Sequence, residues 1–188
     1  MLPLQNLLVI IALSGTGVGL ICIVIMISIR GGNLLGKPST NPLLFYTGKL
    51  SIFFSIGFFL CKAIVPSFGG IHVPEWQAWL GVGMVLPASI LLVVSFFQLG
   101  TSLSYGLSDQ QTRLVTTGLF KYSRNPLYVA LFMINIASAI YFPALVNILV
   151  TIYCIGSHII ITLGEEKFLL NRFKAEWITY KNEVRRFL

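Results

Sequence analysis

Charged side chains are scarce in this sequence of 188 residues: only 10% are Asp, Glu, Lys or Arg, whereas 56% are hydrophobic. A soluble domain carries about 25% charged residues, so this chain has too little polar surface for a water-soluble fold. Among the charged residues the acidic ones are the minority, with 6 Asp and Glu against 13 Lys and Arg, which gives a net charge of +7. Because these cations lie beside apolar runs, they indicate the excess of Lys and Arg in cytoplasmic loops of membrane proteins, not binding to nucleic acid.

The cysteine patterns of a disulfide framework or a metal site are also missing. Cys22, Cys61 and Cys154 lie in apolar runs without a CxxC spacing, so we interpret them as small buried hydrophobic residues and predict no metal site. The first residues contain no Lys- or Arg-rich region, and their apolar run is longer than that of a signal peptide, which predicts a retained span. The lack of a targeting or retention signal favours a prokaryotic cell membrane.

The long apolar runs predict an all-α, polytopic membrane protein with five transmembrane helices. The predicted spans are 1–29, 43–65, 76–99, 127–142 and 144–163. Pro143 separates the last two spans, which are predicted to form a tight helical hairpin. Lys49 and Lys62 lie near the ends of the second span, and we expect both to extend outward to water.

Loop charges predict how these spans are oriented. Lys and Arg concentrate in 30–42, in 100–126 and after residue 163, so these segments and the C-terminus are predicted to be cytoplasmic and the N-terminus to lie outside. We treat 1–188 as one membrane domain, in which 1–99 forms three N-terminal spans and 100–188 forms a polar loop, a helical hairpin and an amphipathic tail.

The tail, 164–188, is predicted to be an amphipathic helix that lies on the membrane surface or closes over the bundle. Apolar residues recur in it at steps of four and three, namely Leu169, Phe173, Trp177, Tyr180, Val184 and Phe187.

A polar, basic segment between two spans is the first candidate for a site. Pro126 suits the first turn of a helix, and Asn125 is a good N-cap before it. The start of such a helix offers backbone N–H groups and a partial positive charge to an anion. Arg124 adds a fork of donors that matches a carboxylate, although it would also suit a lipid phosphate.

Two adjacent carboxylates, Glu165 and Glu166, are the second candidate. They lie where the last span leaves the membrane, which is a costly place for charge. Neither has a Lys or Arg three or four residues away on its helix, so each needs a partner from elsewhere, either Arg124, Lys121 or a cationic ligand. His158 lies two turns earlier on roughly the same face and is either a further ligand contact or a core residue.

Together these groups suit a zwitterionic amino acid with a cationic, aromatic remainder. Arg124 would bind a carboxylate, a glutamate would bind an ammonium group or hydroxyls, and the aromatic rings of Phe120, Tyr122 and Tyr128 would favour a sulfonium. S-adenosylmethionine fits this description, although the residues alone do not single it out.

Three segments carry a family resemblance: LGTSLS at 99–104, RLVTTGLFKYSRNPLY at 113–128 and EEKFLLNRFKAEWITY at 165–180. They resemble the isoprenylcysteine carboxyl methyltransferase and phospholipid methyltransferase superfamily, whose members carry a segment of the type LVTxGPYRYxRHPxY and a glutamate pair followed by FGxxYxxY. The resemblance covers about half of the chain. It implies a membrane-embedded S-adenosylmethionine methyltransferase that releases S-adenosylhomocysteine, with a lipophilic acceptor arriving from the bilayer.

Position by position, the resemblance implies the following site residues. Leu114, Val115 and Gly118 stand where the family's loop wraps the cofactor, with Tyr122 beside them. Arg124, Asn125 and Tyr128 stand for its Arg-His-Pro-x-Tyr, and Glu165 and Glu166 for its glutamate pair. His158 is predicted as a further cofactor contact from its position on the same helix face as Glu165. Arg124, Asn125 and Glu165 are the predicted catalytic residues.

The chain departs from the family's motifs at several positions. Asn125 replaces a histidine, Phe120 a frequent tyrosine, and Lys174 and Trp177 the Gly and first Tyr of the tail motif. Glu183 stands where prenylcysteine enzymes have an Arg, which argues against a prenylcysteine acceptor unless Arg185 or Arg186 takes the place of that Arg.

The acceptor stays open, as a prenylcysteine-type carboxylate or another lipid oxygen or nitrogen. Two other functions compete, an NADPH-dependent enzyme related to sterol reductases and a non-catalytic protein that binds lipid.

Overall fold

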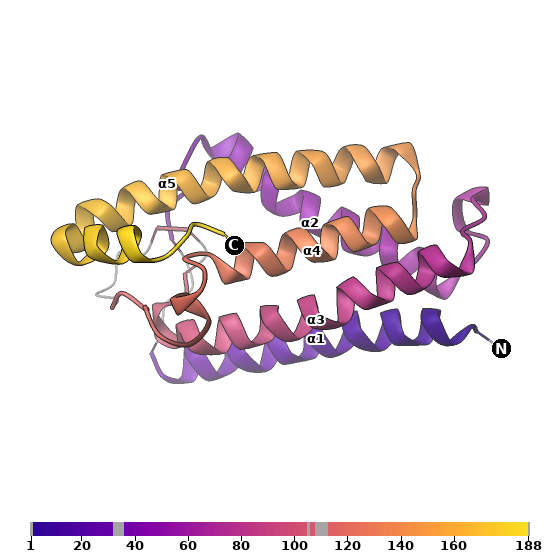
Figure 1. Ribbon diagram of the computed structural model, residues 1–188, viewed down its shortest axis with the longest axis horizontal. Helices are drawn as coiled ribbons and strands as arrows, with labels where there is room; N and C mark the ends of the chain where they lie inside the picture. Colours follow the sequence, from indigo (N-terminus) through magenta and orange to yellow (C-terminus); the bar gives the residue numbers. More distant parts are fainter. Residues whose placement is uncertain (1, 32–35, 105, 108–112, 188) are drawn as a thin grey trace.

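The apolar runs form helices that pass back and forth along one axis (Figure 1). A computed structural model describes residues 2–31, 36–104, 106–107 and 113–187. Its α-helices are α1 (Leu4–Ile29), α2 (Pro42–Ile64), α3 (Glu75–Leu99), α4 (Pro126–Tyr141) and α5 (Leu145–Glu183), and its 3-10 helices are η1 (Phe68–Gly70), η2 (Gly100–Ser102) and η3 (Gly118–Lys121). No strand occurs in these described ranges, where an isolated β-bridge joins Lys37 to Leu107. The prediction of an all-α fold is therefore confirmed.

The helices also have the lengths of a polytopic membrane protein. By length and composition, α1, α2, α3 and α5 could each cross a membrane, whereas α4 is a shorter apolar helix of 16 residues. Such a helix is about 24 Å long, which is less than the roughly 30 Å hydrocarbon core of a bilayer. The predicted class is confirmed, with four long helices and a short one in place of five full spans.

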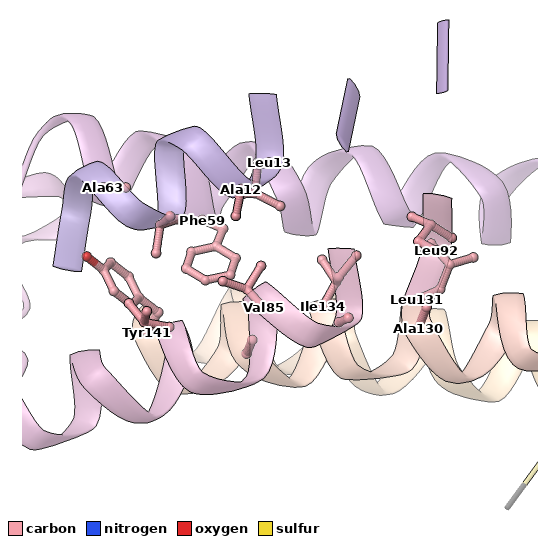
Figure 2. Close-up of a cluster of buried hydrophobic side chains, with 14 of the residues drawn as sticks. Ala12, Leu13, Phe59, Ala63, Val85, Leu92, Ala130, Leu131, Ile134 and Tyr141 are labelled. Carbon is pink, nitrogen blue, oxygen red and sulfur yellow. The ribbon is translucent and has the colours of Figure 1, made fainter. Parts of the chain in front are cut away.

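The short helix α4 lies at the centre of the bundle, which explains how a helix of this length fits. It packs against α2, α3 and α5, and ten of its 16 residues are buried, compared with seven of 26 in α1. Its side chains Ala130, Leu131 and Ile134 belong to the same apolar cluster as Phe59 of α2 and Val85 of α3 (Figure 2). This contact with three helices holds the first turn of α4, and therefore the residues before it, in one position.

The turn between α4 and α5 is held by a buried amide. The side-chain nitrogen of Asn147 donates to the carbonyl oxygens of Ser138 and Phe142, both at 3.0 Å. Both carbonyls also accept a backbone N–H, from Phe142 and Ala144 respectively, so the amide adds a second donor to each and joins the end of α4 to the start of α5. The predicted hairpin at Pro143 is present, with α5 antiparallel to α4 (Figure 1).

The predicted cytoplasmic segments gather at one end of the bundle. The residues described between α1 and α2, those between α3 and α4, and the end of α5 all lie on the left of Figure 1, while the N-terminus and the α4–α5 turn lie on the right. The grouping agrees with the loop charges. The side of the membrane on which this end lies stays a prediction.

Lys62 does not extend outward to water, so our expectation for this residue is wrong. It is 4% exposed, and its ammonium donates to the carbonyl oxygens of Pro66, Phe68 and Ile71 at 2.6, 3.2 and 2.6 Å. Three acceptors match the three donors of a lysine. The loop after α2 therefore satisfies the charge inside the protein.

Helix α5 runs past the bundle and then turns back at Lys174 (Figure 1). We expected a separate amphipathic helix from Gly164, but the helix continues because one glycine among good helix formers does not stop it. The break comes ten residues later, where Lys174 has φ 44° and ψ −112°. The family's tail motif has a glycine at the position of Lys174. A positive φ at this position explains the glycine, because glycine adopts positive φ without steric cost.

Lys174→Gly should therefore stabilise the protein. Replacing the side chain at this positive φ removes a strain of about 1–2 kcal/mol from the folded state. The greater freedom of glycine in the unfolded chain lowers the free energy of unfolding by roughly 0.5–1 kcal/mol, so the net effect is stabilising. We expect an unfolding temperature in detergent that is higher by a few degrees.

Lys167→Gly is the matched control, because Lys167 is exposed and lies in the regular part of the same helix. This change should lower the unfolding temperature, since glycine costs about 1 kcal/mol in a helix interior. Equal destabilisation by both changes would contradict the strain at Lys174.

Candidate functional site

The segment before α4 is held against α3 and the tail. The backbone N–H of Leu119 donates to the side-chain oxygen of Gln98 at 2.9 Å, and the hydroxyl of Tyr180 donates to the carbonyl of Phe120 at 2.7 Å. Gly118 has φ 63°, and a Cβ there would lie 2.6 Å from the Gln98 amide. Gly118 is therefore required for the close approach of this segment to α3.

Arg124 joins the start of α4 to the end of α5. Its Nε and Nη2 donate to Oε1 of Glu166 at 3.1 and 2.9 Å. Its Nη1 donates to the carbonyl oxygens of Lys181 and Val184 at 2.8 and 2.7 Å. Its backbone N–H donates to the carbonyl of Arg185 at 2.9 Å. The guanidinium is thus used largely within the protein, where its side chain is 6% exposed.

The last residues are fixed by the other oxygen of the same carboxylate. Arg186 donates from Nε and Nη2 to Oε2 of Glu166, at 3.0 and 2.9 Å. The carbonyl of Arg186 in turn accepts from the side chains of Asn125 and Ser123, at 3.0 and 3.3 Å. Asn125 occupies the predicted N-cap position of α4, but its side chain bonds the tail and makes no capping bond. Glu166 therefore holds two arginines and ties the tail to α4.

The neighbouring carboxylate, Glu165, points in a different direction. Successive residues of a helix are rotated by about 100°, so adjacent glutamates cannot share one partner set. Glu165 accepts from the hydroxyl of Tyr128, with oxygen–oxygen distances of 2.9 and 3.0 Å. It also interacts electrostatically with Lys49 of α2. Of the two carboxylates, Glu165 is the one that lines a cavity.

This cavity has a volume of about 380 Å³ and lies between the bundle and the returning tail. It falls in the size range of small-molecule sites, which are mainly apolar with a few polar groups. Its aromatic lining residues are Phe96, Phe120, Tyr128, Phe168, Phe173, Trp177 and Tyr180. Trp177 and Tyr180 of the tail are 3% and 6% exposed, so the apolar face of the amphipathic segment covers the cavity.

Six of the ten predicted site residues line this cavity together: Leu114, Val115, Arg124, Asn125, Tyr128 and Glu165. The other four are not among its lining residues. Gly118 packs on Gln98, Tyr122 is 76% exposed, and Glu166 lies between its two arginines.

His158 is the fourth, and it is buried beside a lining residue, Tyr128. It is 1% exposed, its Nδ1 is 2.7 Å from the carbonyl of Cys154, and its ring is 5.6 Å from that of Tyr128. It therefore packs against the tyrosine that contacts Glu165.

Lys49 lines the cavity and was missed by sequence reasoning. We expected it to extend outward to water, and this is wrong: its ammonium lies 5.4 and 5.5 Å from the ring centres of Phe45 and Tyr128. The sequence carries no sign of this, because the direction of a side chain depends on how α2 is rotated against α4 and α5. Arg113, also a lining residue, was missed for a similar reason.

Most of the residues that line this cavity lie in a part of the chain that matches a known protein family. The family described as phospholipid methyltransferase matches residues 76–176, which is more than half of the chain. The match covers α3, α4, the loop between them and α5 as far as the tail, and it therefore includes Arg124, Tyr128 and Glu165. A search of curated proteins finds no match. The resemblance predicted from the sequence motifs is confirmed, and the chain belongs to the phospholipid methyltransferase family, within the superfamily of integral membrane methyltransferases.

Proposed function

We propose that this membrane methyltransferase transfers the methyl group of S-adenosylmethionine to a lipophilic acceptor inside the cavity described above. The family supplies the reaction class. The observation that carries the proposal is that Glu165 and an aromatic wall line one cavity at the start of α4. To this reaction class the proposal adds two statements, that the methyl donor is S-adenosylmethionine and that the acceptor is lipophilic.

The residues of the cavity fit S-adenosylmethionine. Glu165 offers a carboxylate to an ammonium group or to ribose hydroxyls, and the aromatic rings of Phe120 and Trp177 offer faces to an adenine ring and a sulfonium. The start of α4 favours an anion, and Arg113 adds a cation on the same wall. A donor that is both zwitterionic and aromatic matches this set.

Arg124 has a different role in this proposal from the one predicted. Because its guanidinium already donates to Glu166, Lys181 and Val184, we assign it mainly to holding the tail over the cavity. Direct contact of Arg124 or Asn125 with the donor's carboxylate stays a prediction.

S-adenosylmethionine, when bound, supplies a methyl group on a positively charged sulfur. The protein contributes alignment, since fixing two reactants in line can lower a barrier by about 7–11 kcal/mol. The tail covers part of the cavity with Trp177 and Tyr180, and a bound donor that displaces water there would meet charges at a lower dielectric, where they attract more strongly. Glu165 and Tyr128 would orient the donor, because the hydrogen bond of 2.9 Å between them holds both side chains in place.

The acceptor is proposed to reach the cavity from the bilayer. Its apolar lining includes Val24 of α1 and Leu99, Leu103 and Leu127, which suit a hydrocarbon chain and not a polar metabolite. We further propose that this end of the protein faces the cytoplasm, because Lys and Arg concentrate in its loops.

The test is to titrate the purified protein with S-adenosylhomocysteine and to measure the unfolding temperature at each concentration. A ligand that binds the folded state stabilises it in proportion to the logarithm of its concentration over Kd. We expect a rise that begins near Kd and continues with the logarithm of the concentration, reaching several degrees at 100 times Kd. The matched titration with NADPH should leave the unfolding temperature unchanged. Stabilisation by NADPH alone would overturn the proposal in favour of a reductase.

A further inference from the structure

The part of α5 that turns back over the cavity is attached at two ends. It begins at Lys174, where the helix breaks with a φ of 44°. Its far end, residues 184–187, is bonded to the segment at the start of α4 (Figure 1). Between these ends, Trp177 and Tyr180 line the cavity. We call residues 174–187 the cover.

The far end of the cover is held by one charged side chain together with backbone carbonyls. Arg186 donates to Oε2 of Glu166 at 3.0 and 2.9 Å. The ring of Phe187 lies 5.5 Å from that of Phe132 in α4. The side chain of Arg186 is 37% exposed, whereas that of Arg124 is 6% exposed. Water therefore competes for Glu166 at Arg186 more readily than at Arg124.

The other end of the cover carries backbone strain. A side chain at positive φ is disfavoured, and such a residue persists only where the surrounding structure holds it. Lys174 is itself exposed, so its bend depends on contacts made further along the cover. Release of the far end would let Lys174 relax, and the closed cover therefore depends on the bonds of residues 184–187.

The proposed methyl donor has to pass this cover. In the proposed site it lies against the aromatic faces of Phe120 and Trp177, and both side chains are buried. The donor comes from water and its product returns to water after each transfer, whereas a lipophilic acceptor comes from the bilayer. A segment that closes over a ligand in this way usually opens to exchange it, and the opening often limits the rate of turnover.

Building on the proposed function, we propose that the cover opens about Lys174 to admit the methyl donor and to release its product, and that Arg186 is the positioning residue that latches it shut through Glu166. The open state is then a minor population of the wild type. Weakening the latch raises this population in both the free and the occupied protein. Association and dissociation therefore accelerate together, while Kd changes little as long as the closed state predominates.

The first measurement follows labelled S-adenosylhomocysteine as it binds to and leaves the purified protein. We expect Arg186→Gln to raise both rate constants by about tenfold, the low end for loss of a charge-assisted contact, because Arg186 is partly exposed. The Kd should change by no more than about threefold, which also shows that the variant is folded. Arg186→Lys keeps the charge beside Glu166 and should restore most of the wild-type rates. Arg185→Gln is the matched control, because it removes the same charge from the neighbouring exposed side chain.

The second measurement reports on the cover itself and needs no activity. The chain has three tryptophans, and Trp76 and Trp79 lie in the first turns of α3, at the other end of the bundle (Figure 1). Replacing these two by phenylalanine leaves Trp177 as the fluorescent tryptophan. Because Trp177 is buried under the closed cover, acrylamide should quench its emission at least about twice as strongly once Arg186→Gln is added.

Two kinds of result would overturn this inference and leave the proposed function intact. Dissociation that accelerates without association would make Arg186 a support of the donor site and not a latch. Rates that stay at their wild-type values, or that change while the quenching of Trp177 does not, would show that the cover does not control exchange. Failure of the wild type to bind S-adenosylhomocysteine would overturn the proposed function, and this inference with it.

Discussion

Arg124→Ala is expected to abolish methyl transfer, with a fall of more than 100-fold, and to release the tail. The change removes hydrogen bonds to Glu166, Lys181 and Val184 and leaves a carboxylate that is 9% exposed with one arginine in place of two. Removing one partner costs about 3–5 kcal/mol where the buried charge is left alone, and the cost here is expected to be smaller because Arg186 still pairs with Glu166. Because the tail carries Trp177 and Tyr180 of the cavity wall, its release also opens the cavity to water.

The measurement for Arg124 combines transfer of labelled methyl groups with limited proteolysis of the tail. Cleavage after the lysines and arginines beyond residue 173 should become faster in Arg124→Ala, and the unfolding temperature should fall. Arg185→Ala is the matched control, because its side chain is exposed and the change removes the same charge one residue from Arg186. A variant that loses activity while its tail stays protected would contradict the structural role and restore Arg124 as a direct ligand of the donor.

Glu165→Gln is expected to weaken binding of S-adenosylhomocysteine by about 10- to 100-fold without unfolding the protein. A hydrogen bond to a charged group contributes about 1.5–3 kcal/mol, and each 1.4 kcal/mol is a factor of about ten in affinity. The amide oxygen of glutamine can still accept from Tyr128, which in the wild type lies 2.9 Å from the carboxylate. The loss should therefore appear mainly in ligand affinity, with a smaller fall in the unfolding temperature because Lys49 loses the carboxylate with which it interacts.

Calorimetry with S-adenosylhomocysteine checks this expectation for Glu165. Glu176→Gln removes the same charge from an exposed site on the tail and should leave the affinity unchanged. Tyr128→Phe removes a neutral donor, so its effect should be smaller than that of Glu165→Gln, at most about tenfold. An affinity that is unaltered in Glu165→Gln would mean that the carboxylate facing the cavity does not contact the cofactor.

The chemistry of the two motif segments could be predicted because each is a short, polar exception in an apolar chain. The start of α4 at Pro126 follows from the fixed φ of proline, and the covering tail follows from its apolar spacing. The glutamate pair was predicted to need a partner from elsewhere, and Arg124 is a partner of Glu166. These are local properties, so the order of residues is sufficient to find them.

The roles within each segment were less predictable. Nothing in the order of residues distinguishes Glu165 from Glu166, yet the first lines the cavity and the second holds the tail. The difference arises from the rotation of α5, since one residue turns a side chain by about 100°. His158 and Glu165 both contact Tyr128, as expected for one face of α5, but only Glu165 is among the residues that line the cavity.

By itself, the sequence determined that this is an all-α membrane protein of the phospholipid methyltransferase family, because hydrophobicity and short motifs are read residue by residue. Only the tertiary structure decided that Lys49 faces inward, that Arg124 is used to hold the tail and that Glu165 is the carboxylate of the cavity. The physical reason is that these directions depend on how α2, α4 and α5 pack around the short central helix. That packing is a sum of contacts between residues far apart in the chain.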